Sequence, residues 1–210
     1  MDKPRFITFI ILLIITVTIG IGAAWIRYSK EIRIPFISDP VQNSIDEAIE
    51  AYDFKTSDYS ETVDAIKNLG EDAIPGLADM IENEDKKVRY ISFISLSGLA
   101  YQIPEKKSEI IPLLNKGLQD TDPTIKVQTA QILSLFGEKA AVPVLIDALD
   151  SEEMMVPSEP IMLLREYAYF ILRENTDQDY GYEKDKWFSW WEENKNTVEF
   201  DEENKKFKTV

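Results

Sequence analysis

Apolar positions recur along most of the chain at the three- and four-residue spacing of amphipathic helices, and one such helical pattern repeats. The segment that begins at residues 74–77 (IPGL) aligns without gaps with the segment that begins at residues 111–114 (IPLL), at an offset of 37 residues. A third copy begins at residues 142–145 (VPVL) and resumes at Leu164 after an insertion of eight residues. A recurrence of this length predicts stacked copies of one supersecondary unit.

Each copy predicts two helices joined by a polar, Asp-rich turn. A proline near the start suits the first turn of a helix, where its missing N–H would be unbonded anyway. Apolar residues then recur three and four positions apart, as Leu77, Met80 and Ile81 do in the first copy. Because one pair cannot bury its apolar faces alone, neighbouring pairs must cover one another.

The pattern weakens towards both ends of the chain. Residues 44–70 predict a degenerate helix pair, as expected of a terminal unit. The predicted fold is all-α: a right-handed α-α superhelix of about four helix pairs over residues 44–183, then a Trp-rich capping helix at 184–196. The tail at 197–210 is expected to be extended, as a short hairpin, or disordered.

An uncharged run of 21 residues at 6–26 precedes the repeats. As a helix it is about 30 Å long, which matches the hydrocarbon core of a bilayer. Residues 1–30 therefore predict a single membrane anchor, followed by a Pro-containing linker at 31–43. A cleaved signal peptide and a buried helix remain alternatives, although the run is longer than a signal peptide needs and apolar on every face. The expected location is a single-pass membrane protein whose body lies outside the cytoplasm.

The composition excludes several chemistries. The chain has no cysteine and no histidine, so it has no thiolate nucleophile, disulfide or imidazole metal ligand. Asp177 and Asp179 do not complete a calcium-loop pattern. Beyond residue 33 the chain carries 18 cations against 36 anions, a net charge of −18, which disfavours binding to nucleic acid. No catalytic residue, metal site or cofactor is predicted.

The repeated pattern resembles HEAT repeats, in particular the short bacterial kind that also occurs in phycobilin lyases. The residues that carry the resemblance are those at 74–77 with Asp85, Val88 and Arg89, together with their copies, and the Trp-rich segment at 174–195. It covers about residues 60–200 and implies an α-solenoid. With the anchor, it implies a protein-interaction scaffold without catalysis, an accessory subunit of a membrane complex. The alternative is a phycobilin-lyase-like enzyme or a chaperone of chromophore attachment.

The resemblance also implies a structural role for charged residues at the start of the second helices. In HEAT repeats the matching positions form a ladder that holds successive units in register. Its expected members are Asp85, Arg89, Asp122, Lys126 and Arg165. Within one helix, an acid four residues before a base can also pair with it.

Three tryptophans, Trp187, Trp190 and Trp191, lie on one face of the last predicted helix. We expect them to cover the open end of the last repeat. An exposed stripe that grips a partner is the alternative.

Candidate residues for binding a protein partner lie beside the apolar stripe of the second helices and in the insertion of the third copy. Such residues either form a groove for a partner or pack against neighbouring helices. The candidates on the second helices are Tyr90, Phe93, Val127, Tyr169 and Phe170. In the insertion, Met155 is either an adaptable contact or part of a tolerated surface loop.

Overall fold

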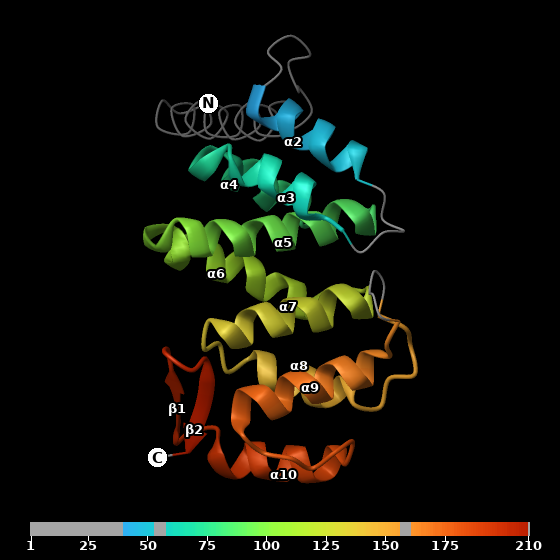
Figure 1. The fold of residues 1–210 in the computed structure, drawn as a ribbon, viewed down its shortest axis with the longest axis vertical. Helices are drawn as coiled ribbons and strands as arrows, with labels where there is room; N and C mark the ends of the chain where they lie inside the picture. Colours follow the sequence, from blue (N-terminus) through green and yellow to red (C-terminus); the bar gives the residue numbers. More distant parts are fainter. Residues whose placement is uncertain (1–39, 53–57, 156–160, 210) are drawn as a thin grey trace, which may run out of the picture. The chain divides into compact units, whose positions relative to one another are not determined.

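The computed structural model describes residues 40–52, 58–155 and 161–209, and within these ranges the helices follow one another as antiparallel pairs (Figure 1). Pair 1 is α2 (Pro40–Ala51) and α3 (Ser60–Lys67), and pair 2 is α4 (Ala73–Met80) and α5 (Lys86–Gln102). Pair 3 is α6 (Lys107–Lys116) and α7 (Pro123–Leu135), and pair 4 is α8 (Ala141–Ala148) and α9 (Leu164–Thr176). After them come α10 (Lys184–Asn194) and the strands β1 (Val198–Asp201) and β2 (Lys206–Thr209).

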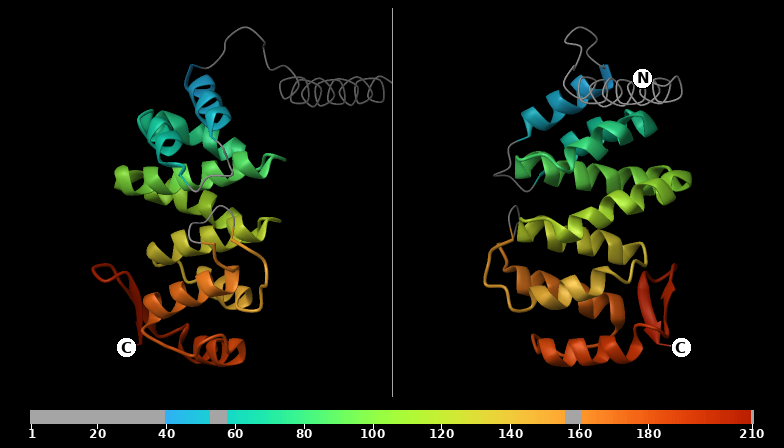
Figure 2. Two further views of the ribbon diagram at one scale, coloured as in Figure 1. Left: turned by 45° about the vertical axis from the view of Figure 1, so that its right-hand side comes forward. Right: turned by 180° about the vertical axis from the view of Figure 1, so that it is seen from behind.

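The pairs stack through their second helices. Helix α3 packs against α5, α5 against α7, and α7 against α9, while α10 packs on α8 (Figure 2). A continuous apolar core runs through these contacts, from Ile45 in α2 to Phe207 in β2. The mostly helical, paired architecture agrees with the fold class predicted from the repeat, and the right-handed superhelical twist stays a prediction.

The second helices of pairs 2 and 3 begin where the sequence places an aspartate. The Asp85 carboxylate accepts a hydrogen bond from the backbone N–H of Lys87, and that of Asp122 accepts from Thr124 and Ile125. Each therefore satisfies N–H groups that the first turn of a helix leaves unbonded. These caps stabilise the first turns of α5 and α7.

The prolines of the repeat differ in their positions. Pro75 and Pro143 are the third residues of α4 and α8, in the first turn as expected. Pro112 lies inside α6 instead, because that helix begins at Lys107, five residues earlier. The missing N–H of Pro112 removes one bond of the helical ladder there.

The linker predicted at 31–43 ends too late. Helix α2 begins at Pro40, and its first residues include Val41, which packs on the core. A proline is favoured at the first helical position, and Ile45 and Ile49 supply the buried stripe that holds the helix. The proline interpreted as a linker residue is thus a helix start.

The tail forms a hairpin rather than a disordered segment. Strands β1 and β2 pair antiparallel, with Phe200 opposite Phe207, and β2 packs against α9. The hairpin therefore lies at the side of the stack, next to the last second helix, while α10 covers the end of the stack (Figure 1).

The membrane anchor predicted at 6–26 lies outside the described residues. Within 40–52, 58–155 and 161–209, no helix is both long and apolar enough to cross a bilayer.

Candidate interaction surfaces

Arg89 on α5 joins pair 2 to pair 3. Its Nε and Nη2 donate hydrogen bonds to the two carboxylate oxygens of Asp120, at 2.8 and 2.9 Å. Its Nη1 donates to the carbonyl oxygens of Asn83 and Glu84. The side chains of Arg89 and Asp120 are only 12% and 5% exposed, and the hydrogen bond to Asp120 raises the pKa of Arg89 above its ordinary value. A two-bond pairing of this kind fixes the relative position of the two helix pairs.

The pairing within the predicted ladder is therefore different from the one expected. Among the described side chains, Asp85 forms no ion pair with Arg89, because its carboxylate caps α5. Asp122 caps α7 and pairs with Lys86 across the junction, at 3.3 Å. The residue that holds Arg89, Asp120, was missed because it aligns with Asn83 in the first copy, so the repeat alignment carries no signal for it.

The ladder does not continue past pair 3 in the described structure. Neither Lys126 nor Arg165 has an ion-pair partner among the described residues. At the offset of 31 residues that relates Pro112 to Pro143, the counterpart of Asp120 is Ser151, which offers Lys126 no carboxylate. Arg165 instead lies over the ring of Tyr182, with its Cζ 6.0 Å from the ring centre.

Four of the candidate residues for binding a partner are buried, which favours the alternative that they pack against neighbouring parts of the chain over an exposed groove. Tyr90 and Phe93 are each 2% exposed, Val127 is 3% exposed and Met155 is 5% exposed. Tyr90 and Phe93 are buried because α5 contacts α2, α3, α4, α6 and α7. Val127 is buried because α7 contacts α5, α6, α8 and α9, and Met155 belongs to the apolar core. Burial also raises the pKa of Tyr90.

The remaining two candidates lie on an exposed aromatic surface of α9. Phe170 is 46% exposed, and Tyr169 is half-buried beside it, with ring centres 5.8 Å apart. The ring of Tyr182, 50% exposed in the turn before α10, lies 5.2 Å from that of Tyr169. The Arg173 guanidinium lies over the rings of both Tyr169 and Phe170, at 5.6 and 5.4 Å. We call this surface the α9 patch: Arg165, Tyr169, Phe170, Arg173 and Tyr182.

Two members of the α9 patch, Arg173 and Tyr182, were not singled out from the sequence. Arg173 follows Tyr169 by four and Phe170 by three residues, a spacing that places all three on one helix face. Tyr182 reaches the patch because the chain reverses at Asp177, whose φ is +56°. The Asp179 carboxylate then accepts a hydrogen bond from the Tyr169 hydroxyl at 3.0 Å, which holds the turn against the helix.

The three tryptophans of α10 are buried and therefore do not form an exposed stripe. Trp187 is fully buried, and Trp190 and Trp191 are 8% and 3% exposed. The Nε1–H of Trp187 donates to the carbonyl oxygen of Gly181 at 2.9 Å. Since α10 packs on α8, these rings cover the end of pair 4.

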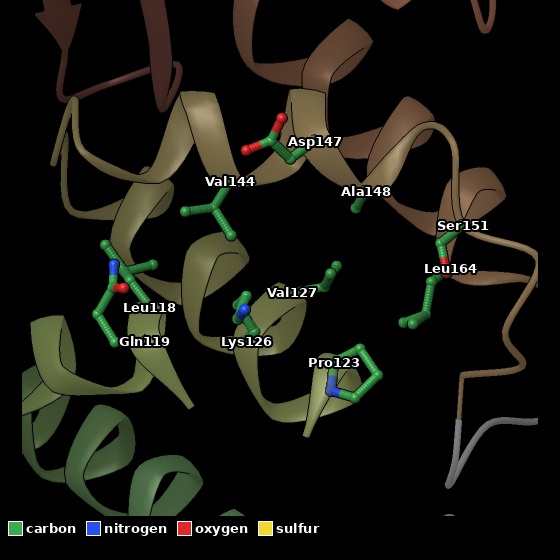
Figure 3. Close-up of a pocket in the computed structure, with 10 residues that line it drawn as sticks. All are labelled: Leu118, Gln119, Pro123, Lys126, Val127, Val144, Asp147, Ala148, Ser151 and Leu164. Carbon is green, nitrogen blue, oxygen red and sulfur yellow. The ribbon is translucent and has the colours of Figure 1, made fainter. Parts of the chain in front are cut away.

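A pocket of about 320 Å³ lies between pairs 3 and 4 (Figure 3). Its polar lining consists of Gln119, Lys126, Asp147 and Ser151. The apolar residues that line it are Leu118, Pro123, Val127, Val144, Ala148 and Leu164. Figure 3 shows Lys126 in the middle of these side chains and the Asp147 carboxylate pointing away from it.

Part of the chain matches a known protein family. Residues 74–156 match the family model described as HEAT repeats, a range that begins in α4 and extends beyond α8. No curated protein and no solved structure matches the chain. This part of the chain is therefore similar to HEAT repeats, which generally mediate protein–protein interaction through surfaces made by successive repeats.

Proposed function

We propose that the chain is a membrane-anchored scaffold that holds a protein partner and catalyses no reaction of its own. The α9 patch is the observation that carries this proposal, and the family match to HEAT repeats supports it. The apolar run at 6–26 supports the anchor. The body of the protein lies outside the cytoplasm in this proposal.

The chemistry of the α9 patch suits a protein contact. Tyrosine and arginine are enriched among the residues that dominate binding energy at interfaces. The patch gathers three aromatic rings and two guanidinium groups on one short surface. The stacking of Arg173 on two rings pre-orders its long side chain, which lowers the entropy lost when a partner binds. On a chain of net charge −15, Arg165 and Arg173 favour a partner surface with apolar and acidic side chains.

The test compares the full chain with a double substitution of the two most exposed rings, Phe170→Ser and Tyr182→Ser. The matched control is Phe188→Ser, a ring on α10 that is 50% exposed like Tyr182. Proteins crosslinked to each form in native membranes are quantified by mass spectrometry. We expect at least one stoichiometric partner to be lost from the double variant and retained by the control. A partner set that is the same for all three forms would refute the role of the patch.

The anchor and its orientation have a separate test. Because the chain has no cysteine, one introduced cysteine supplies the only thiol that can be labelled. Asn196→Cys places one thiol on an exposed position after α10. In intact cells, a membrane-impermeant maleimide should label this thiol, and the chain should remain with the membrane after carbonate extraction. Labelling that appears only after the cells are lysed would place the body in the cytoplasm. Release by carbonate would exclude the anchor.

A further inference from the structure

At the junction between pairs 2 and 3, the charged side chains beside a pocket are paired with one another. A depression of about 320 Å³ lies there too, lined by Glu82, Arg89, Lys116 and Asp120 among others. All four of these charges are paired: Arg89 with Asp120 at 2.8 Å, and Lys116 with Glu82 at 2.6 Å.

The same four positions are altered at the junction between pairs 3 and 4. At the repeat offset of 37 residues, Gln119 corresponds to Glu82 and Lys126 corresponds to Arg89. At the offset of 31 residues, Asp147 corresponds to Lys116 and Ser151 corresponds to Asp120. Each pair of positions thus carries one charge instead of two: Lys126 keeps the positive charge of Arg89, whereas Asp147 is negative where Lys116 is positive.

The two charged side chains at this junction, Asp147 and Lys126, differ in whether they have a partner. The Asp147 carboxylate pairs with Lys184 of α10 at 3.1 Å, and it points away from the pocket (Figure 3). Lys126 is half-buried, and its ammonium group has no hydrogen bond or ion pair within the described ranges. The nearest acid in the sequence, Asp122, is held by the first turn of α7 and by Lys86. An unpaired ammonium group is therefore left beside an apolar wall.

We propose that this pocket binds an aliphatic carboxylate, with Lys126 as its counter-charge. The carboxylate takes the place that Asp120 occupies beside Arg89 at the other junction. The Gln119 amide and the Ser151 hydroxyl are further donors in the lining. The aliphatic part of the ligand lies against Leu118, Val127, Val144, Ala148 and Leu164. The volume is at the lower end for ligand pockets, which fits a small acid or the last residue of a peptide. This inference does not rest on the proposed function, because no residue of the α9 patch lines the pocket.

The probes are two acids and their neutral amides. One acid is 4-methylpentanoate, compared with 4-methylpentanamide. The other is N-acetyl-alanyl-leucine with a free terminal carboxylate, compared with its amide. Binding to the full chain is measured by ligand-observed NMR and isothermal titration calorimetry. At least one acid should bind, and its amide should bind at least about tenfold more weakly because a charge-assisted hydrogen bond is lost. Binding of the peptide acid alone assigns the site to a chain end, and binding of 4-methylpentanoate to a free acid.

Two variants separate the pocket from general charge effects. Lys126→Met should weaken binding of the acid at least about tenfold. Lys116→Met, which removes the same charge from the neighbouring junction, should leave it unchanged. The double substitution Lys126→Arg with Ser151→Asp rebuilds the arginine–aspartate pair and should abolish binding in a folded protein.

Three results would overturn the proposal. The first is that neither acid binds the full chain. The second is that the acids and their amides bind equally. The third is that Lys126→Met, or the rebuilt pair, binds the acid as the unaltered chain does. None of these results bears on the crosslinking test of the α9 patch, so the two proposals fail separately.

Discussion

Ser95 on α5 is a buried polar residue without a bonding partner. It is fully buried, and its hydroxyl has no hydrogen-bond partner among the residues that the structure describes. The equivalent position in pair 3 is Ile132, so the repeat itself does not require a hydroxyl there. We expect Ser95→Ala to raise the free energy of unfolding by about 1 kcal/mol, because an unsatisfied buried hydroxyl costs stability. Urea denaturation measures the change.

Ser92 is the control for this substitution. It is equally buried, but its hydroxyl donates to the carbonyl oxygen of Val88 at 2.7 Å. Ser92→Ala should therefore leave stability unchanged or lower it by up to about 1 kcal/mol. If both substitutions change stability alike, the Ser95 hydroxyl is not unsatisfied in solution.

Gly137, after α7, is required for two reasons that can be separated. Its φ is +80°, and a Cβ at this position would lie 2.7 Å from the ring of Phe200 in β1. Gly181 shares a positive φ, of +57°, but has nothing within 4 Å of the same point. Gly181→Ala should cost about 1–2 kcal/mol for the backbone conformation alone. Gly137→Ala should cost more, because the hairpin must also move away. Equal losses of thermal stability would show that β1 does not pack there.

At the scale of the helix pairs, the stability of the contact between pairs 2 and 3 depends on the Arg89–Asp120 ion pair. Arg89→Met leaves a carboxylate that is 5% exposed without its counter-charge, so we expect a loss of about 3 kcal/mol. In a double-mutant cycle with Asp120→Asn, the coupling energy should reach about 2 kcal/mol. The exposed Lys116–Glu82 pair spans the same junction, and its cycle should give less than about 1 kcal/mol. Urea denaturation of all the variants measures both cycles, and equal coupling energies would contradict the assignment of Arg89 as the main link.

The apolar periodicity predicted the helix pairs because each helix must bury its stripe, and that requirement is local. It did not predict which second-helix residues remain exposed. Tyr90 and Tyr169 are both aromatic residues beside the apolar stripe of a second helix. Helix α5 is nevertheless covered by neighbouring helices on several sides, whereas α9 keeps a solvent-facing side that includes Phe170. The pairing of Arg89 with Asp120 rather than with Asp85 likewise depends on a contact between pairs, which no spacing within one helix encodes.

At the scale of the whole chain, the C-terminal end also depends on contacts that spacing within one helix does not predict. The spacing of the tryptophans predicted a helix that covers the last pair. The packing of Phe207 against Trp191, with ring centres 6.3 Å apart, requires the strands to return to α9 after α10 ends. That return is a contact between distant parts of the chain, so the sequence left the hairpin and disorder as alternatives.

Tyr90, which is buried, and Tyr167, which is half-buried, contribute to the change in stability of the described fold at alkaline pH. Burial raises the pKa of Tyr167 to about 12 and raises that of Tyr90 as well. The Tyr167 hydroxyl lies 3.3 Å from the Gln128 oxygen and also contacts Gln131, so it links α9 to α7. Because the folded state keeps this phenol protonated above the unfolded pKa of about 10, the stabilising contribution of the phenol is fully present below pH 10. This contribution is then lost as the pH rises towards 12.

Between those pH values, Tyr167 should contribute a decrease of about 1.4 kcal/mol per pH unit to the free energy of unfolding. Tyr167→Phe should be less stable than the unaltered chain at pH 8, because the links to Gln128 and Gln131 are lost, but its stability should decrease less steeply above pH 10. Urea denaturation at pH 8, 10 and 11 measures both slopes, with Tyr182→Phe, an exposed tyrosine, as the control that keeps the steep slope. If the free energy of unfolding decreased with pH in parallel for the unaltered chain and Tyr167→Phe, the phenol would ionise as readily in the folded chain as in the unfolded one. The Tyr167 side chain would then not be packed between α9 and α7.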